Sequence, residues 1–437
     1  PAFAFFALTG RMADGHSYAA DAMKHGAAVC ICERRIEGLP LPQVVLPNAR
    51  RALAFAAANF YGNPQRRMKL VGVTGTNGKT TTAYMLKTIF SHGGYKTALL
   101  GTAKGSIGDA AYTPPLDAAE ADEYETMTTP DPEVLYRTLA DLAARGVEVT
   151  VMEASSHALA LDKLAPIEFA LGIFTNLSHE HLDFHGSMEN YLAAKAKLFD
   201  SCRVGLFNAD DAAGRELLQN TACRAVSYGL TPPCDYLAEE IESYGVRGSS
   251  YLLHTRGARF RVKTQIPGSF TLYNTLAAAA AARECGVDLV CIQNALYALR
   301  GIAGRLEKVN LGFMGGAFTV FIDYAHTPFA LENLLRCVRA FRGTGQRIVT
   351  LFGCGGARDR EKRPEMGRIA VENSDFVILT SDNPRAEEPQ AILADILKGV
   401  GKADNYTVIE NRREAIEYAV ANALAGDIIL LVGKGHE

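Results

Sequence analysis

Several features that would assign this chain to a specialised class of protein are missing. Its 437 residues contain no Lys/Arg-rich run of the kind that binds nucleic acid, and the formal net charge is only −3. No stretch reaches the roughly 18 apolar residues that a membrane-spanning helix needs. The apolar run Phe3–Leu8 lacks the basic flank and cleavage site of a secretory leader. We therefore expect no leader, no membrane insertion and no nucleic-acid partner.

Paired cysteines are also missing. The nine cysteines are scattered, and none forms a Cys-x-x-Cys pair. An odd number without paired spacing argues against a disulfide framework and against a zinc site. Cys30 and Cys32 share an apolar, strand-like run, where packing in a core is the favoured interpretation. This usage suits a reducing compartment, so we expect a cytoplasmic protein, and we also expect a monomer.

The composition that remains is that of an ordinary globular protein. Hydrophobic residues make up 48% and charged residues 21%, and the length allows two to four domains. A polar cluster at Asn63–Arg67 and a glycine-containing joint at Gly301–Gly304 separate three blocks. We predict domains at residues 1–66, 67–302 and 303–437.

The two ends of the chain bear on these domains. The sequence opens within a strand pattern and stops directly after Gly433-Lys-Gly-His436. We therefore expect the first domain to be incomplete at its N-terminus and the third at its C-terminus.

Strand and helix patterns alternate through all three blocks, which predicts an α/β fold with mostly parallel sheets covered by helices. A β-rich stretch, Tyr251–Ile266, is predicted as a hairpin or meander. The predicted strands are Ala4–Leu8, Ala27–Cys32, Gln43–Leu46, Lys69–Val73, Thr150–Glu153, Ala170–Thr175, Val204–Asn208, Phe318–Asp323, Arg347–Phe352, Phe376–Thr380, Tyr406–Ile409 and Ile428–Val432. The predicted helices are Ala49–Phe60, Thr80–His92, Pro132–Arg145, Met188–Phe199, Tyr273–Glu284, Pro328–Phe341, Arg363–Glu372, Pro389–Lys398 and Arg412–Leu424.

The strongest local signal is a strand, a glycine-rich turn and a helix over Val71–Thr82. Glycines let the backbone approach phosphate, and free N–H groups at a helix start form an anion site. Lys79 would reach the β- and γ-phosphates, and the Thr80 hydroxyl would bind Mg²⁺. Val73 stands where the strict pattern has a first glycine, so a turn without a ligand remains an alternative. The predicted nucleotide contacts are Gly75, Thr76, Asn77, Gly78, Lys79, Thr80 and Thr81.

Two further segments carry polar side chains directly after apolar strands. Glu153 ends a predicted strand at the sheet edge where ligands bind, and a buried carboxylate without a cation is unfavourable. A Mg²⁺ ligand is therefore favoured over a structural role. Three histidines, His179, His181 and His185, lie in the predicted loop after the next strand. At least one is expected to be functional, with a zinc site as the rival, although thiolates and helical His-Glu-x-x-His spacing are absent from this segment.

The stretch Gly75-Thr-Asn-Gly-Lys-Thr80 resembles the shortened phosphate loop of the Mur ligase and folylpolyglutamate synthetase superfamily, which couples ATP cleavage to amide formation. Further segments resemble those of Mur ligases, so that the resemblance covers nearly the whole chain. It implies a small N-terminal α/β domain that binds a UDP-sugar, a central ATPase domain with a P-loop and a parallel sheet, and a C-terminal Rossmann-like domain. It also implies ATP as substrate and two Mg²⁺ ions.

The resemblance changes the interpretation of two lysines, Lys195 and Lys197, which on a helix would ordinarily be solvated. Mur ligases carry at the first position a lysine carbamylated by CO₂, an N6-carboxylysine that supplies oxygen ligands to the second Mg²⁺. By similarity, Lys195 has this role and His181 binds the same ion. The catalytic residues implied are Lys79, Glu153, His181, Lys195 and Arg305.

Other segments resemble the parts of Mur ligases that hold the nucleotide. Gly268–Asn274 is similar to the adenine-binding segment, with Thr271 in place of its first asparagine, which leaves Asn274 as the expected contact. Gly304–Glu307 and Asp323–Pro328 are similar to segments that close on ATP. The resemblance implies that Arg305 neutralises the γ-phosphate and that Asp323 and His326 hold the nucleotide.

A loop of the third block predicts the choice of amine. Asp382-Asn-Pro-Arg385 follows a predicted strand, and on pattern alone it is equally an Asx-type turn that starts a helix. It resembles the loop of Mur ligases that add meso-diaminopimelate, in which an arginine can bind a carboxylate through two parallel hydrogen bonds. The contacts implied are Arg358, Asp382, Asn383, Pro384, Arg385, Gly433 and Glu437, with Glu437 taking the distal ammonium.

The acceptor UDP-MurNAc-L-Ala-D-Glu is implied by the same resemblance. Gly10–His16 is similar to a uridine-binding stretch, and Leu161 and Lys163 stand where relatives often carry Gln and Arg. The family's Ser-Arg uridine contacts are not in this sequence. The acceptor contacts implied are Arg11, Met12, Ala13, Thr128, Thr129, Ser155, Leu161 and Lys163.

The reaction implied joins meso-diaminopimelate to the D-Glu γ-carboxylate through an acyl phosphate, in peptidoglycan synthesis. Three alternatives stay open. A lysine-adding ligase of the same fold would leave Arg385 idle, and a folylpolyglutamate synthetase would lack the uridine-type first domain. A non-catalytic scaffold would not need Lys79, Glu153, His181 and Lys195 together.

Overall fold

The computed structural model describes residues 3–10, 13–102, 105–117, 120–121, 124, 127–312, 317–357 and 359–435. Of the predicted site residues, Arg11, Met12, Arg358 and Glu437 lie outside the described residues. The contacts divide the chain into two compact units. The first comprises Pro1–Asp235 and Ala277–Asp288, and the second Tyr236–Leu276 and Leu289–Glu437. The division into three domains stays a prediction.

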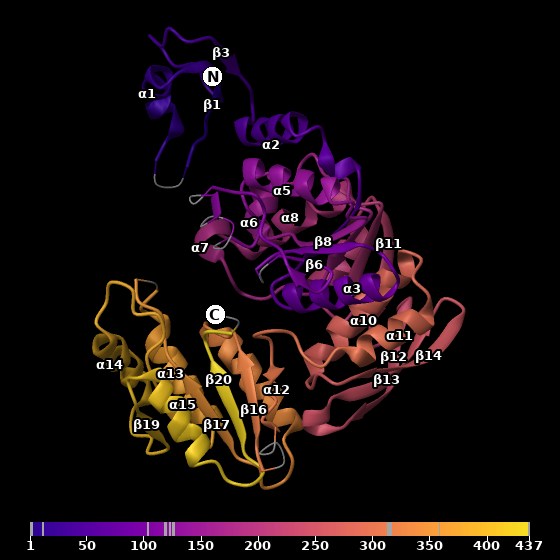
Figure 1. The fold of residues 1–437 in the computed structure, drawn as a ribbon, viewed down its shortest axis with the longest axis vertical. Coiled ribbons are helices and arrows are strands. Elements are labelled where there is room, and N and C mark those ends of the chain that lie inside the picture. The colour runs from indigo at the N-terminus through magenta and orange to yellow at the C-terminus, as the bar shows by residue number, and fades with distance from the viewer. Residues whose placement is uncertain are drawn as a thin grey trace. The chain divides into compact units, whose positions relative to one another are not determined.

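The first unit opens with a small parallel sheet in the order β1-β2-β3. Figure 1 labels its strands β1 and β3 and the helix α1. Its elements are β1 (Phe3–Ala7), α1 (Ala19–Lys24), β2 (Ala27–Cys32) and β3 (Gln43–Val45). Cys30 and Cys32 are both fully buried in its apolar cluster, which confirms the interpretation of these cysteines as core residues.

The same unit contains the parallel strands β11-β10-β9-β4-β8-β5, and two short antiparallel strands, β6 and β7, extend them. The strands are β4 (Lys69–Thr74), β5 (Thr97–Leu100), β6 (Ser106–Ile107), β7 (Ala110–Ala111), β8 (Val149–Glu153), β9 (Leu171–Phe174), β10 (Val204–Asn208) and β11 (Arg224–Gly229). The helices are α2 (Ala49–Phe60), α3 (Lys79–His92), α5 (Pro132–Ala144), α6 (Ser156–Ala160), α7 (Leu182–His185), α8 (Met188–Ala196) and α9 (Ala212–Asn220). Since β4 pairs with both β8 and β9, the carboxyl ends of these strands lie side by side.

The second unit contains an antiparallel meander, β12-β13-β14, and a six-stranded sheet in the order β15-β16-β20-β17-β18-β19. Apolar clusters cover both faces of the six-stranded sheet, one with α12, α13 and α14 and the other with α15. The strands are β12 (Tyr236–Ser243), β13 (Ser249–Thr255), β14 (Ala258–Thr264), β15 (Glu307–Lys308), β16 (Thr319–Asp323), β17 (Ile348–Phe352), β18 (Phe376–Leu379), β19 (Tyr406–Val408) and β20 (Ile428–Val432). The helices are α10 (Ser269–Glu284, which the two units share), α11 (Leu289–Ala298), α12 (Pro328–Phe341), α13 (Lys362–Asn373), α14 (Pro389–Val400) and α15 (Arg412–Ala421).

The structure differs from the sequence prediction at several helix boundaries and in one predicted loop. Helix α10 begins at Ser269 instead of Tyr273, because Gly268 at φ 102° turns the chain directly into the helix. Helix α8 ends at Ala196, short of the predicted Phe199, after which the chain tightens into a 3₁₀ turn. The segment predicted as a histidine-rich loop contains the one-turn helix α7.

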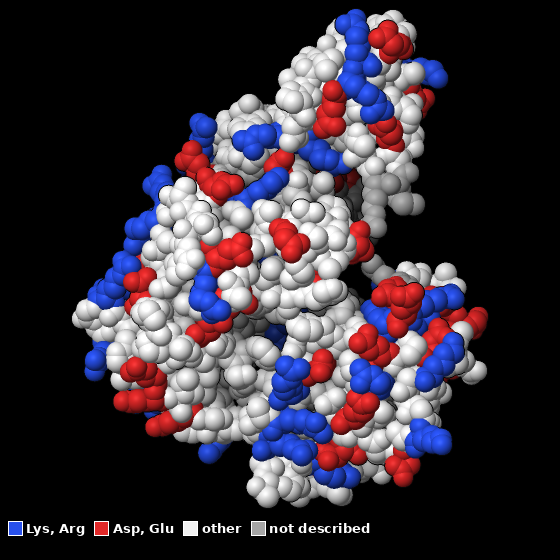
Figure 2. Space-filling model, turned by 180° about the vertical axis from the view of Figure 1, so that it is seen from behind, with Lys and Arg blue, Asp and Glu red and all other residues white. Residues whose placement is uncertain are grey.

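The surface carries charges of both signs. On the face in view in Figure 2, Lys and Arg side chains are interspersed with Asp and Glu. Among the helices built from described residues, none combines the length and apolar character needed to cross a bilayer.

Candidate active site

The phosphate loop, Gly75–Thr80, connects buried strand β4 to helix α3, as the sequence predicts. Gly75 and Gly78 have φ angles of 139° and 83°, which side chains rarely adopt. A Cβ at Gly75 would also lie 1.9 Å from Thr175 Oγ1. Both glycines are therefore required by the shape of the loop.

Residues that follow β9 fix this loop from the neighbouring strand. Asn176 accepts from Asn77 N through Oδ1 at 3.0 Å and donates to Asn77 O at 3.1 Å. Thr175 Oγ1 donates to the same carbonyl at 2.6 Å. Sequence reasoning assigned no role to Thr175 and Asn176; their position directly after an apolar strand was the available signal.

Two lysines converge on one carbonyl of the loop. Lys79 Nζ donates to Gly75 O at 3.0 Å and to Thr76 O at 2.7 Å, and Lys195 Nζ donates to Gly75 O at 2.8 Å. Lys195 is only 1% exposed. Burial, and then the neighbouring Lys79 cation, lower the pKa of Lys195 well below its ordinary value. Negative charge placed beside these two lysines would therefore be stabilised.

A hydroxyl and a carboxylate meet beside these lysines. Thr80 Oγ1 donates to Glu153 Oε1 at 3.0 Å, and Thr102 N donates to the same oxygen at 2.9 Å. Glu153 is 1% exposed at the end of β8. Oxygen ligands of this kind suit Mg²⁺, which keeps several positions for water and phosphate oxygens. Nothing in the sequence pointed to Thr102.

The histidines form an aromatic cluster. His157 lies 4.9 Å from His181 and 5.5 Å from His185 between ring centroids. His185 is buried and its Nε2 lies 3.0 Å from Ser156 Oγ, a structural position. Burial lowers the pKa of His181, and the Lys79 and Lys195 cations lower it further while Glu180 raises it. Among the described residues, no group of three or more His, Cys, Asp or Glu side chains is arranged to hold a metal ion.

His157 gives a pH prediction for stability. Burial, followed by the charges of His181 and His185, lowers the pKa of His157 from 6.5 to about 4. The unfolded chain therefore binds a proton that the folded chain excludes, and stability should be full above about pH 6.5 and fall as the pH drops towards 4. Chemical denaturation without nucleotide or metal measures the free energy of unfolding. As the pH drops, this free energy should fall less in His157→Gln than in the wild type. His92→Gln, at an exposed site on α3, serves as the control; an equal pH dependence in all three proteins would contradict the prediction.

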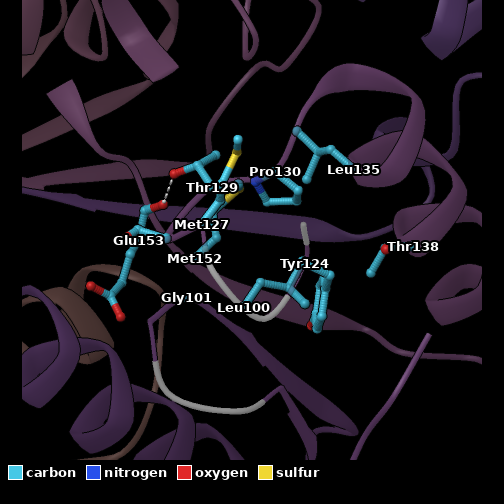
Figure 3. A pocket seen from close by; sticks show the side chains of 11 residues that line it. Leu100, Gly101, Tyr124, Met127, Thr129, Pro130, Leu135, Thr138, Met152 and Glu153 are labelled. Atoms are coloured by element: carbon cyan, nitrogen blue, oxygen red, sulfur yellow. Dashed lines mark hydrogen bonds between the residues drawn. The ribbon is translucent and has the colours of Figure 1, made fainter. Parts of the chain in front are cut away.

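The predicted acceptor residues of the first unit lie next to Glu153. Thr129 Oγ1 donates to Glu153 O at 3.0 Å and to Ser155 Oγ at 3.1 Å. The Thr128 hydroxyl lies 3.0 Å from the Thr102 hydroxyl. Thr128, Thr129 and Glu153 line one pocket (Figure 3). The structure therefore brings acceptor and metal candidates together.

Lys163 and Leu161 line a different pocket, together with Arg50. The Lys163 side chain is almost fully buried, its Nζ lies 2.5 Å from Asp131 Oδ1, and it donates to Thr129 O at 3.4 Å. Arg50 was not singled out from the sequence. Ala13 is not among the residues of either pocket.

In the second unit, three predicted nucleotide residues cluster at the end of β16. The Asp323 carboxylate accepts from Leu306 N at 2.8 Å and from Ala325 N at 2.9 Å. Burial raises the pKa of Asp323, and the neighbouring Arg305 cation lowers it. Arg305 and His326 both lie against the Tyr324 ring. Asp323 therefore holds the backbone of the loop that carries Arg305. Its contact with nucleotide stays a prediction. Asn274 is buried on α10.

The Asp382–Arg385 turn follows β18 and contacts two other loops. Arg385, at φ 51°, donates from Nη1 to Gly356 O at 2.8 Å. Lys434 Nζ donates to Asn383 Oδ1 at 2.6 Å. A Cβ at Gly433 would lie 2.7 Å from Asp382 Oδ2. The structure thus assembles the described amine-site candidates, and it adds Lys434, which sequence reasoning missed.

Comparison with known proteins identifies the family. The Mur ligase middle domain matches residues 73–282, and the Mur ligase glutamate ligase domain matches residues 304–435. A UDP-N-acetylmuramoyl-L-alanyl-D-glutamate–2,6-diaminopimelate ligase of Clostridium tetani is 41% identical over 437 residues, which cover 99% of this chain and 87% of the relative. This chain belongs to the Mur ligase family. The sequence resemblance is confirmed.

Further Mur ligases of the same description are similar. The one from Geobacillus thermodenitrificans is 40% identical over 447 residues, with 100% of this chain and 88% of the relative covered. A solved structure of a ligase with that description has a TM-score of 0.71 at 32% identity, covering 99% of this chain and 87% of that one. A Mycobacterium tuberculosis folylpolyglutamate synthase complexed with ADP also reaches 0.71, at 20% identity and with 88% and 91% covered, which shows a shared fold alone. The predicted α/β Mur ligase fold is confirmed.

Proposed function

We propose that this Mur ligase joins meso-diaminopimelate to the D-Glu γ-carboxylate of UDP-MurNAc-L-Ala-D-Glu, with cleavage of ATP, in peptidoglycan synthesis. The observation that carries the proposal is the convergence of Lys79, Lys195, Thr80 and Glu153 on one phosphate loop. Relatives about 40% identical over almost the whole chain are described as ligases of this specificity.

The proposed reaction has two steps. The γ-carboxylate oxygen attacks the γ-phosphorus of ATP, which releases ADP and forms an acyl phosphate. The amine of meso-diaminopimelate then attacks the acyl carbon, loses a proton and expels phosphate. Lys79 and Arg305 neutralise the charge that develops on the phosphoryl oxygens, and the acceptor is positioned by Thr128, Thr129 and Ser155.

Mg²⁺ fits the oxygen donors of this site. Thr80 and Glu153 would hold one ion, and His181 with the carbamate of Lys195 would hold a second. When bound, such ions neutralise phosphate oxygens during transfer. Carbamylation joins the neutral Lys195 amine to CO₂ and releases a proton. The burial of Lys195 beside the phosphate loop supports this role, because a permanent cation there would repel a metal ion.

The amine would bind at the described loops of the second unit. Arg385, whose guanidinium lies beside the Gly356 carbonyl, would hold the distal carboxylate. We also infer a monomer that acts in the cytoplasm, where ATP and nucleotide sugars are available.

Phosphate release with a panel of amines tests the proposal. With ATP, Mg²⁺ and UDP-MurNAc-L-Ala-D-Glu, meso-diaminopimelate should give the highest kcat/KM, and L-lysine should be poor. Omitting either the acceptor or the amine should abolish steady release. A preference for L-lysine would show that the enzyme is a lysine-adding ligase. Activity on a folate with glutamate would show that it is a folylpolyglutamate synthetase. A chain that hydrolyses no ATP with any combination would be a scaffold.

A further inference from the structure

Arg363, on α13, is a fully buried arginine outside the residues assigned so far: its side chain is 0% exposed. A buried guanidinium is unfavourable unless it is paired and hydrogen-bonded. Its Nη1 and Nη2 donate to the two oxygens of Glu387 at 3.0 and 2.9 Å, a two-pronged pair. Nη1 also donates to Asp395 Oδ2 at 3.0 Å and Nη2 to Gly355 O at 3.3 Å. This side chain is therefore a fixed junction of several elements.

Glu387 extends the junction to the loop after β17. Its Oε1 accepts from Ala357 N at 2.6 Å, and Ala357 has a φ of 50°, which an alanine rarely adopts. Hydrogen bonding to Arg363 and to Ala357 N lowers the pKa of Glu387 to about 2, so the carboxylate stays charged at any working pH. Arg363 thus donates a hydrogen bond to Gly355 directly, and it holds Ala357 in place through Glu387.

Gly356, between these two held residues, contacts the amine-site turn. Its carbonyl accepts from Arg385 Nη1 at 2.8 Å, and its N–H donates to Asn383 O at 2.9 Å. A Cβ at Gly356 would lie 1.8 Å from Pro384 O, so the two loops are in close contact. Arg385 itself has a φ of 51°. The position of the Arg385 guanidinium therefore depends on Gly356. The residues before and after Gly356 are fixed by hydrogen bonds to Arg363 and Glu387.

We propose that Arg363 is a positioning residue for the amine substrate: with Glu387 it fixes the Gly355–Ala357 loop, against which the guanidinium of Arg385 is oriented towards the distal carboxylate. This inference rests on the proposed function. A lysine cannot replace this arginine, because one ammonium cannot bind both oxygens of Glu387 in parallel while reaching Asp395 and Gly355. The competing interpretation is that Arg363 only stabilises the second unit.

Arg363→Lys and Glu387→Gln separate the two interpretations. Glu387→Gln keeps an acceptor for Ala357 N and removes the charge pair. Both should raise the KM for meso-diaminopimelate about tenfold or more, since a small misplacement of a binding group can reduce efficiency up to about 100-fold. The KM for ATP should stay within about twofold. Arg368→Met is the matched control, because Arg368 lies on the same helix and pairs with Glu372 at the surface.

A double-variant cycle tests the route through Arg385. If Arg363 acts through that guanidinium, Arg363→Lys should change the KM for the amine little in an Arg385→Ala background. If the effects of the two substitutions on the KM for the amine are additive, Arg363 has a structural role only. The same follows if the KM values for all three substrates rise equally and the melting temperature falls. A wild-type enzyme that does not use meso-diaminopimelate would overturn the proposed function. An active wild type with an unchanged KM in both single variants would overturn this inference alone.

Discussion

Alanine in place of Lys195 should remove nearly all turnover, with kcat lowered by about 10²–10³-fold or more, the effect of losing one charge-stabilising group in a preorganised site. Lys195 is buried against the phosphate loop, and its proposed carbamate would be a ligand of the second Mg²⁺. Steady-state phosphate release measures the loss. Short carboxylates such as acetate should restore part of the activity, since they can supply the missing oxygens.

Lys197→Ala is the control for this prediction. Lys197 lies directly after the same helix, but its ammonium pairs with Asp162 at 3.0 Å and is 43% exposed. The Lys197→Ala enzyme should therefore retain most of the wild-type kcat. Native mass spectrometry in bicarbonate should show the mass of one added CO₂ on the wild type and none on Lys195→Ala. An active Lys195→Ala enzyme would rule out the carbamate as a metal ligand.

Arg385→Ala should raise the KM for meso-diaminopimelate steeply and leave the KM for ATP nearly unchanged. Breaking one partner of a shielded, two-pronged charge pair costs about 2–5 kcal/mol, which corresponds to roughly 30- to 5000-fold at 1.4 kcal/mol per decade. L-Lysine lacks the distal carboxylate, so its poor use should change little. The ratio of kcat/KM between the two amines should therefore shrink.

The same amine pair supplies the control experiment. Arg368→Ala, at the surface of α13, should leave both kcat/KM values as in the wild type. If wild-type enzyme accepts the two amines equally, or if Arg385→Ala preserves their ratio, another residue makes the discrimination.

Elements with strong periodicity could be predicted from the sequence. The helix Ala49–Phe60 and the strand Val204–Asn208 agree with the structure at both ends. The phosphate loop could also be predicted from the sequence, because its strand, glycines and lysine are contiguous. The start of α10 could not be predicted, since it depends on the positive φ of Gly268.

Residues that act across strands escaped prediction. Asn176 and Thr102 reach the phosphate loop and Glu153 only because β9, β4, β8 and β5 lie in that order in the sheet. A single sequence shows where strands occur, but it does not show which strands are neighbours. Arg363 escaped for the same reason, because its partners belong to loops that follow two different strands.

The shared helix α10 has a consequence for how this chain is made. The first compact unit includes Ala277–Asp288, whose buried alanines and the Arg224–Glu284 ion pair belong to it, although Tyr236–Leu276 belongs to the second unit. Domains generally fold as they leave the ribosome, N-terminus first. In this chain, the first unit includes the segment Ala277–Asp288, which is synthesised after Tyr236–Leu276 of the second unit. The first unit is therefore complete only once Asp288 has been synthesised, and a recombinant fragment that ends at Asp235 would lack its Ala277–Asp288 segment.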